Sequence, residues 1–370
     1  MRIEMVVPSM IAAGMETVVA NLSRSLVRRG HAVGITCLQT RGVLADALDG
    51  EGIRVNMVDA SGPGTLLWPS ALTHWIRRVA PDIVHAHSGV WMKSARAARG
   101  AGVRAMIHTM HGFPDVDPWH RPWIERAAAR WTSAITVVSE PLRQYVTQTL
   151  HVDAGRVHLL LNGVDATRFR PGTAADANPR FGQPARRFII GHIGRFSPVK
   201  NHALLLESFQ RVRTEFPEAF LVLVGDGPLR EEVRARASAI GLTEHVAFPG
   251  VHADASPLYR DFDLFVLPSL LEQTSMSILE AMASGTPVVA TDVGGSAALL
   301  DQGHAGVLVP SGDADALATA ILELMRDPER RRELGRRGRA RVLAEYDHEK
   351  MVDRYETLYH DLAGAPRRAP

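Results

Sequence analysis

The first polar segment with clear chemical potential follows an apolar run at residues 188–194. Gly194-Arg195 ends this run, and a short loop then leads to Lys200-Asn201 at the expected start of a helix. Arginine offers a planar fork of donors, lysine adds a point charge, and a helix N-terminus exposes N–H groups, so this segment has the chemistry to hold a diphosphate. The chain has 39 arginines but three lysines, which argues against a casual surface lysine here. The alternative is a solvated pair of charges at a helix end.

Two glutamates follow the apolar run at residues 262–267. Glu272 lies in the polar loop after the run, and Glu280 lies on the helix expected next, so that neither is expected in the core. A carboxylate accepts hydrogen bonds from vicinal hydroxyls, which sugars and ribose both carry. The loop amides before the helix are suited to face a phosphate. The residues of that loop are Gln273, Thr274, Ser275, Met276 and Ser277. The alternative is that both acids are surface residues near a helix start, where acids are favoured.

Glycines and one histidine mark three further strand ends. Gly225, Asp226 and Gly227 close one apolar run, a shape that lets a ligand approach the backbone. Gly14, between the first expected strand and helix, would allow a similar approach to a phosphate. His111 ends another run beside a glycine, where its ring could form a hydrogen bond with a ligand. The alternatives are plain turns for the glycines and a structural histidine for His111.

No metal site is expected. His85 and His87 share a strand end, but their alternating spacing alone is poor evidence for a metal. A single cysteine, Cys37, gives no Cys–His constellation for zinc, and no Walker-type phosphate loop is present. No Asp-x-Asp motif lies at a strand end beside the proposed phosphate site.

Short apolar runs alternate with longer amphipathic segments, which is typical of βαβ units and a parallel sheet. Strands are expected at residues 2–7, 32–37, 53–58, 82–85, 104–109, 133–138, 156–160, 188–194, 219–225, 245–248, 262–267, 287–291 and 306–309. Helices of the second half are expected at about residues 200–215, 228–240, 276–284, 313–326 and 328–362. Residues 170–186, rich in Pro, Gly and Ala, predict a linker between two domains. Because ligands bind beyond the carboxyl ends of such strands, the site is expected in a cleft between the two domains.

The composition narrows the class of protein. With 370 residues, 46% of them apolar, the chain is long enough for two cores. One cysteine, no long apolar run of about 18 residues and no signal-peptide pattern together favour a cytoplasmic protein without a membrane span. The chain has no dense basic run interleaved with aromatic residues, so the sequence does not indicate a nucleic-acid partner.

Charge is distributed unevenly along the chain. Residues 1–170 hold 19 basic and 13 acidic side chains, and residues 171–370 hold 23 and 27. The net charge of +6 in the first half favours contact with an anionic partner or with an anionic membrane at its inner face. Ordinary variation of surface charge is an equally good explanation.

These motifs together resemble the retaining GT-B glycosyltransferases of family 4, over almost the whole chain. The most specific part is residues 264–295, where Glu272 and Glu280 form a Glu-x7-Glu pair followed by the Ala-Met-Ala-x-Gly-x-Pro-Val-Val-Ala-Thr pattern. Segments 161–165, 194–201 and 223–228 follow in the order that the family shows. Three departures leave the preferred sugar open: Ala13 in place of a usual glycine, Gln273 in place of a frequent one, and Ser296-Ala297-Ala298-Leu299 in place of a Pro-Glu-like element.

The resemblance implies an α/β fold of GT-B type, with two Rossmann-like parallel-sheet domains facing a central cleft. The N-terminal acceptor domain would comprise residues 1–170 plus about 345–370, because the C-terminal helix crosses back to it, and the donor domain residues 187–344. By analogy Arg195 and Lys200 would hold the diphosphate, Glu272 the transferred sugar and Glu280 the ribose. His111 would approach the donor sugar, and Gly14 its phosphates. Glu272, His111, Arg195 and Lys200 are therefore the expected catalytic residues.

The expected reaction is hexosyl transfer from a nucleotide diphosphate sugar, without a metal or another cofactor. A UDP-sugar is the preferred donor, and a glycan, a lipid-linked saccharide or a small molecule the acceptor, as in polysaccharide biosynthesis. Two alternatives remain. One is a sugar-nucleotide 2-epimerase of the same fold, and the other is a non-catalytic module that binds nucleotide sugars or glycans.

Overall fold

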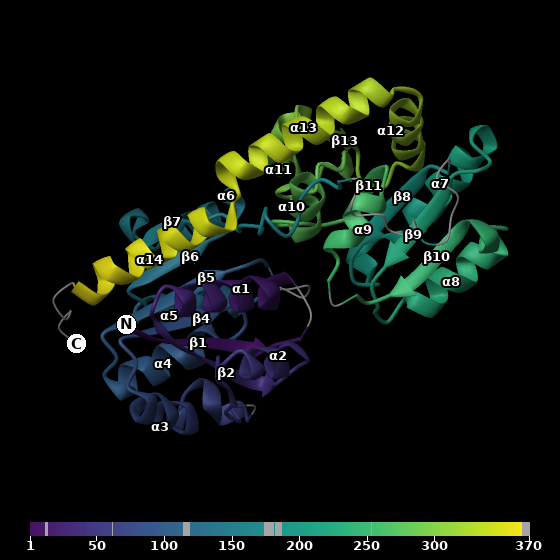
Figure 1. Ribbon diagram of the computed structural model, residues 1–370. Coiled ribbons are helices and arrows are strands. Elements are labelled where there is room, and N and C mark those ends of the chain that lie inside the picture. Colours follow the sequence, from purple (N-terminus) through teal and green to yellow (C-terminus); the bar gives the residue numbers. More distant parts are fainter. Residues whose placement is uncertain are drawn as a thin grey trace. The chain divides into compact units, whose positions relative to one another are not determined.

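The computed structural model describes residues 1–11, 14–60, 62–113, 119–173, 181, 187–252 and 254–364. The chain forms two compact units (Figure 1). The first comprises residues 1–162 and 349–370, and the second comprises residues 163–348. Most of the linker predicted at residues 170–186 lies outside the described residues. Within the described part of the chain, no helix has the length and apolar character needed to cross a bilayer.

The first unit is built on a parallel sheet of seven strands in the order β3-β2-β1-β4-β5-β6-β7. Its strands are β1 (Arg2–Ser9), β2 (Ala32–Thr40), β3 (Val55–Met57), β4 (Ile83–His87), β5 (Ala105–Met110), β6 (Ala134–Val137) and β7 (Val157–Leu159). Its helices are α1 (Gly14–Arg28), α2 (Leu44–Gly50), α3 (Ser70–Val79), α4 (Trp91–Ala101), α5 (Arg121–Ala129), α6 (Glu140–Gln144) and α14 (His348–Gly364).

Both faces of this sheet are covered, because every residue of β4 and β5 is buried. Strands buried on two sides need near-continuous apolar runs, which is why these segments are easy to recognise in the sequence. The order reverses after β3, so right-handed crossovers place α1 and α2 on one face and α3, α4 and α5 on the other. Figure 1 shows α3 and α4 close together on their side of the sheet.

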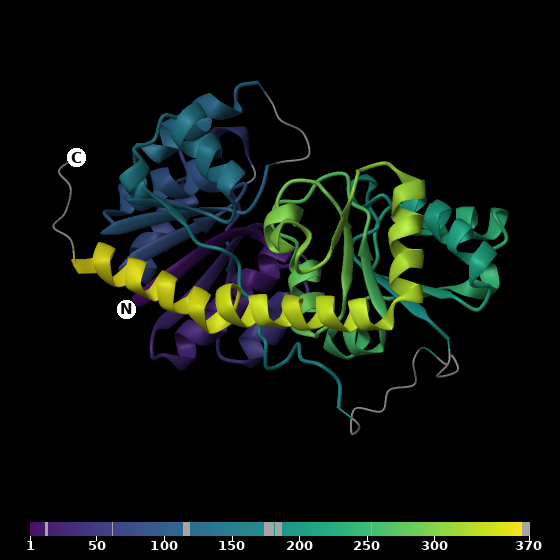
Figure 2. The ribbon, with the colours of Figure 1, turned by 90° about the horizontal axis from the view of Figure 1, so that it is seen from above.

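The C-terminal helix α14 belongs to the first unit (Figure 2). Its Tyr355 and Tyr359 are fully buried. The hydroxyl of Tyr359 lies 2.7 Å from Nδ1 of His85, and that of Tyr355 lies 3.2 Å from Oγ1 of Thr109. These contacts fix α14 to strands β4 and β5.

The second unit has a parallel sheet of six strands in the order β10-β9-β8-β11-β12-β13. Its strands are β8 (Ile189–Ile193), β9 (Phe220–Val224), β10 (Val246–Gly250), β11 (Leu264–Leu267), β12 (Val288–Thr291) and β13 (Val307–Val309). Its helices are α7 (His202–Glu215), α8 (Arg230–Ala239), α9 (Ser256–Asp261), α10 (Met276–Ala283), α11 (Ser296–Leu299), α12 (Ala314–Arg326) and α13 (Pro328–Glu345).

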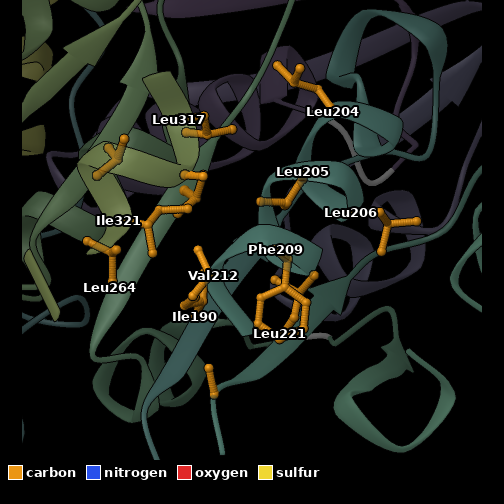
Figure 3. Packing of buried hydrophobic residues seen from close by; sticks show 14 of the residues in the cluster. Ile190, Leu204, Leu205, Leu206, Phe209, Val212, Leu221, Leu264, Leu317 and Ile321 are labelled. Carbon is orange, nitrogen blue, oxygen red and sulfur yellow. The ribbon is translucent and has the colours of Figure 1, made fainter. Parts of the chain in front are cut away.

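Apolar packing in the second unit brings α7 and α12 onto the middle of the sheet (Figure 3). Leu205 and Phe209 of α7 and Leu317 of α12 are fully buried together with Ile190 and Leu264 of the strands. Burial of such side chains stabilises each by about 1.5–3 kcal/mol relative to exposure. The two helices therefore hold β8 and β11 rigidly, and the loops that follow these strands carry the polar residues considered next.

Candidate active site

Glu272 is buried just beyond the carboxyl end of β11, and its side chain is 9% exposed. Its Oε1 accepts a hydrogen bond from Oγ of Ser269 at 2.7 Å. The same oxygen forms an ion pair with Nζ of Lys200, which follows β8. The sheet thus brings together two predicted residues that are 72 positions apart in the chain. Burial is tolerated because the ammonium and the hydroxyl together offset the desolvated charge.

Lys200 is held in place by the local structure of its loop. A short 3-10 turn, Pro198–Lys200, precedes Asn201, which adopts a left-handed conformation with φ of 47°. The side chain of Asn201 caps α7 by accepting a hydrogen bond from the amide of Leu204 at 3.4 Å. The amide of Leu270 donates to the carbonyl of Val199 at 2.8 Å, which ties the loop after β11 to the loop after β8.

Arg195 differs from Lys200 in having no ion pair. It is exposed at the end of β8, and its guanidinium contacts no carboxylate in the described part of the chain. A guanidinium without a counter-charge, one loop away from the Lys200–Glu272 pair, is available to an anionic ligand.

The glycines after β9 are required by contact between two loops. Gly225 has φ of 134°, and a Cβ there would lie 2.1 Å from the carbonyl oxygen of Gly194. Gly227 has φ of 154°, and a Cβ there would lie 2.5 Å from the carbonyl oxygen of Phe196. The carbonyl of Asp226 accepts a hydrogen bond from the amide of Phe196 at 3.0 Å. These residues position the Arg195 loop, and their contact with a ligand stays a prediction.

Two further glycines support Glu272, and the sequence analysis did not identify them as part of the site. A Cβ on Gly294 would lie 1.6 Å from the carbonyl oxygen of Glu272, and one on Gly295 would lie 1.8 Å from that of Gln273. The amide of Gly295 also donates to the carbonyl of Glu272 at 3.2 Å. The paired glycines after β12 were the available signal, because adjacent glycines at a strand end indicate a close backbone approach.

The loop that carries Glu272 ends at the N-terminus of α10. Ser275 is its N-cap and accepts a hydrogen bond from the amide of Ile278 at 3.4 Å. Its hydroxyl also lies 3.1 Å from that of Ser277. Gln273 and Thr274 precede this cap, and Met276 begins the helix. The predicted phosphate-facing amides therefore do lie at a helix N-terminus.

Glu280 lies within α10 and is partly buried. The hydroxyl of Tyr259 donates to Oε2 of Glu280 at 2.7 Å, and the ring of Tyr259 is fully buried. Burial raises the pKa of Glu280 to about 7, although the bond from Tyr259 and the charge of Arg168 act in the opposite direction. Tyr259 was not identified in the sequence, because a tyrosine in a short helix 21 residues away gives no local signal.

The predicted His111 belongs to a cluster of histidines at the carboxyl edge of the first sheet. Its Nε2 lies 2.9 Å from Nδ1 of His87, and its backbone amide donates to Oγ of Ser88 at 2.9 Å. Behind them Nε2 of His85 lies 2.6 Å from Oγ1 of Thr109. Within the described residues, Nδ1 of His111 and Nε2 of His87 have no hydrogen-bond partner.

The histidines of this cluster are neutral at pH 7. Burial lowers the pKa of His111 to about 4 and that of His85 to about 3, where the charge of His111 acts in the same direction. Burial also lowers the pKa of His87 and of His108 well below their usual range. The edge of the first sheet thus offers uncharged donors and acceptors.

Gly14 lies at the exposed start of α1, while Ala12 and Ala13 lie outside the described residues. Two positions on, Glu16 is buried and accepts a hydrogen bond from Oγ of Ser9 at 3.0 Å. Burial raises the pKa of Glu16. Glu16 was not predicted as a site residue, because an acid in a first helical turn is favoured electrostatically and needs no further role.

Comparison with known proteins covers both units. Residues 176–341 match the family described as Glycosyl transferases group 1, and residues 12–168 match Glycosyltransferase Family 4. The putative glycosyltransferase EpsF of Bacillus subtilis (strain 168) is 32% identical over 305 residues, which cover 79% of each chain. The chain belongs to family 4 of the glycosyltransferases.

Further relatives of this family 4 glycosyltransferase agree. An Escherichia coli UDP-Gal:alpha-D-GlcNAc-diphosphoundecaprenol alpha-1,3-galactosyltransferase is 27% identical over 293 residues, 76% of each chain. The crystal structure of Anabaena Alr3699/HepE in complex with UDP superimposes with a TM-score of 0.86 at 21% identity, covering 98% of this chain and all of that one. The predicted GT-B fold with two Rossmann-like domains is confirmed, and the chain is an enzyme, a glycosyltransferase.

The predicted site residues of this glycosyltransferase fall into two groups. Arg195, Lys200, the 225–227 loop, Glu272 and the α10 segment with Glu280 all lie at the carboxyl edge of the second sheet or on the helix that follows. His111 and Gly14 lie at the same edge of the first sheet. Their individual roles toward a ligand stay predictions.

Proposed function

We propose that this glycosyltransferase moves a sugar, with retention of configuration, from a nucleotide diphosphate sugar, preferably a UDP-sugar. The proposal is carried by the cluster of Lys200, Glu272 and Ser269 beside Arg195, which has no carboxylate partner among the residues that the structure describes. Two cations and a helix N-terminus at one sheet edge suit a diphosphate, and a carboxylate beside them suits a sugar hydroxyl.

The proposed reaction breaks the bond between the anomeric carbon and the diphosphate oxygen. A hydroxyl oxygen of the acceptor forms the new bond to that carbon, and its proton passes to the departing diphosphate. Negative charge grows on the diphosphate during this step. Arg195, Lys200 and the α10 amides would stabilise that charge, which is electrostatic catalysis by groups already in place. No protein general base and no metal are assigned.

Glu272 is proposed to orient the transferred sugar. Its Oε1 is occupied by Ser269 and Lys200. Its Oε2 has no hydrogen-bond partner among the described residues and would accept a bond from a sugar hydroxyl. The same carboxylate would thereby connect the sugar with the lysine of the phosphate site, and orientation of this kind lowers the barrier of the chemical step.

Glu280 is proposed to hold the ribose, and Tyr259 to orient Glu280. A carboxylate accepts two bonds from vicinal hydroxyls only when it is ionised. His111 would contact the donor sugar as a neutral hydrogen-bonding group.

The acceptor is proposed to be a glycan, a lipid-linked saccharide or a small molecule bound by the first unit. The Escherichia coli relative, whose name gives a lipid diphosphate acceptor, supports the lipid-linked class. The basic first half supports a cytoplasmic location with peripheral contact at the inner face of an anionic membrane.

The test is incubation of the enzyme with UDP-, GDP- and ADP-sugars, after a thermal-shift screen for the nucleotide that binds. Slow hydrolysis of one donor, unchanged in EDTA, and an acceptor product with the anomeric configuration of the donor are expected. Conversion of the donor to its 2-epimer would favour the epimerase, and donor binding without turnover under any condition would favour the non-catalytic module. Loss of activity in EDTA with rescue by magnesium or manganese would contradict metal independence.

A further inference from the structure

A surface groove of about 820 Å³ lies along helices α3 and α4 of the first unit, and none of its lining residues is a proposed donor residue. Its lining residues are Leu67, Trp68, Pro69, Ser70, Thr73, His74, Arg77, Arg96, Arg99, Gly100 and Trp131. We call it the Arg–Trp groove. None of these residues is acidic, so the charged side chains that line the groove are all basic.

Two of the three arginines in the groove, Arg96 and Arg99, lie over tryptophan rings, and the third, Arg77, donates a hydrogen bond to the carbonyl of Gly100. The guanidinium carbon of Arg96 lies 5.4 Å from the ring centre of Trp68 and 5.2 Å from that of Trp131. The guanidinium carbon of Arg99 lies 5.5 Å from the ring centre of Trp131. Stacking fixes the direction of each planar fork while leaving its N–H groups free to bind an anion.

These arginines also lack the counter-charges that many others in the chain have. Arg336 and Arg337 on α13, for example, both pair with Glu333. By contrast, neither Arg96 nor Arg99 contacts a carboxylate anywhere in the described ranges. Arg96 is half-buried and Arg99 is exposed, and a guanidinium without a carboxylate gains more from an external anion than one that is already paired.

The helices on this side of the sheet are depleted in acid as a group. Helices α3, α4 and α5 contain seven basic residues and one acid, Glu125, which is itself paired with Arg121 at 2.7 Å. The positive charge of the first half is therefore concentrated on one face of the first unit. A field of this extent favours an extended anionic surface over a single small ion.

The rim of the groove carries exposed apolar side chains. Trp68 is 75% exposed and its neighbour Leu67 is 56% exposed. Tryptophan is the residue favoured at the boundary between lipid headgroups and acyl chains. Below the rim, a Cβ on Gly100 would lie 3.2 Å from Thr73, so α3 and α4 are in close contact and form a firm base.

We propose that the Arg–Trp groove docks the first unit on a bilayer of anionic phospholipids. The lipid phosphates bind between Arg77, Arg96 and Arg99, and Trp68 and Leu67 enter the headgroup layer. This proposal rests on the membrane contact in the proposed function and names the residues that make that contact. Vesicle binding is measured without any sugar transfer. Failure of the donor assignment would leave it untouched.

The test is flotation of the full-length protein with phosphatidylcholine vesicles, with and without one-third phosphatidylglycerol. Binding to the anionic vesicles alone, weakened by salt, is expected. The double variant Arg96→Gln/Arg99→Gln should bind about 30-fold more weakly, because each arginine near an anionic surface contributes a factor of about five. Arg336→Gln/Arg337→Gln removes the same charge from α13 and should bind like the parent. Trp68→Ala should also weaken binding, and circular dichroism with thermal melting reports that every variant is folded.

Three results would overturn the proposal. The first is no flotation of the parent with anionic vesicles. The second is an equal loss of vesicle binding in the groove double variant and in the α13 double variant. The third is a soluble anion site, in which inorganic phosphate or glycerol phosphate raises the melting temperature of the parent but not of the groove variant, without vesicle binding.

Discussion

The carboxyl edges of the two sheets solve the burial of polar groups in opposite ways. In the second unit, Lys200 and Glu272 form an ion pair that Ser269 supports. In the first unit, His87 and His111 contact each other, neither is paired with an acid among the described residues, and burial lowers the pKa of both. A buried charge persists where a counter-charge is built beside it, and a titratable group without one becomes neutral.

This difference separates two kinds of chemistry. The second edge can respond to charge that develops on a ligand, whereas the first can offer neutral hydrogen bonds that do not change between pH 6 and 8. An enzyme that transfers a sugar from a diphosphate needs charged groups at the phosphate and directional groups at the sugar. The four predictions below test this division, beginning with the charged edge.

Replacing Glu272 by Gln should reduce kcat on the order of 100-fold, because the sugar loses its orienting carboxylate and Lys200 loses its counter-charge. Steady-state kinetics with the true acceptor measure this. Glu207→Gln is the matched control, since Glu207 pairs with Arg211 on the surface of α7 and should have no effect. A folded Glu272→Gln enzyme turning over at the parental rate would show that the site is assigned wrongly.

Replacing Glu280 by Gln should raise the donor KM about tenfold with little change in kcat, because a charge-assisted bond to a non-reacting part of the donor contributes roughly 1.5 kcal/mol of uniform binding. The parental donor KM should fall as pH rises through about 7, where Glu280 ionises, and the Gln variant should lose this dependence. An unchanged KM with a lower kcat would place Glu280 near the reacting atoms instead.

Glu280 should also make the ligand-free enzyme less stable as pH rises. The pKa of a free glutamate is 4.5 and that of Glu280 is about 7, so between these values the folded state holds a proton that the unfolded state has lost. The free energy of unfolding should therefore decrease over this window, by up to about 3 kcal/mol for a pKa difference of this size. Urea titrations of the parent and of Glu280→Gln over this pH window measure the free energy of unfolding. The same pH dependence in both proteins would contradict a glutamate that burial keeps protonated.

The smallest effect is expected at His111, whose ring should not titrate between pH 5.5 and 8 because its pKa is about 4. NMR of ring carbons in labelled protein tests this. His111→Asn, which keeps a neutral hydrogen-bonding group, should retain most of the donor hydrolysis rate. A titration of His111 near its usual pKa would remove the contrast between the two edges.

The thirteen strands found in the described residues were predictable because a parallel strand is a local signal. The run at residues 82–85 becomes β4 and the run at residues 219–225 becomes β9, each within two residues at its ends. The helices α9 and α11, with six and four residues, were not predicted, since so few turns give no readable periodicity.

The candidate site was predicted as a set of residues but not as a set of contacts. The Lys200–Glu272 pair and the bond from Tyr259 to Glu280 join residues that are distant in the chain. The expectation that Glu272 lies outside the core was wrong. The polar sequence around Glu272 indicates an exposed loop. The lysine that makes the burial of Glu272 tolerable follows a different strand and therefore gives no local signal.

The position of α14 has a consequence for synthesis on the ribosome. The buried Tyr355 and Tyr359, which complete the packing around β4 and β5, are translated after all of residues 163–348. Residues 163–348 form an uninterrupted unit that emerges earlier. All residues of the second unit are therefore available for folding while α14 of the first unit has still to be synthesised. A chain that stops before residue 349 would retain the second unit and leave His85 and Thr109 uncovered.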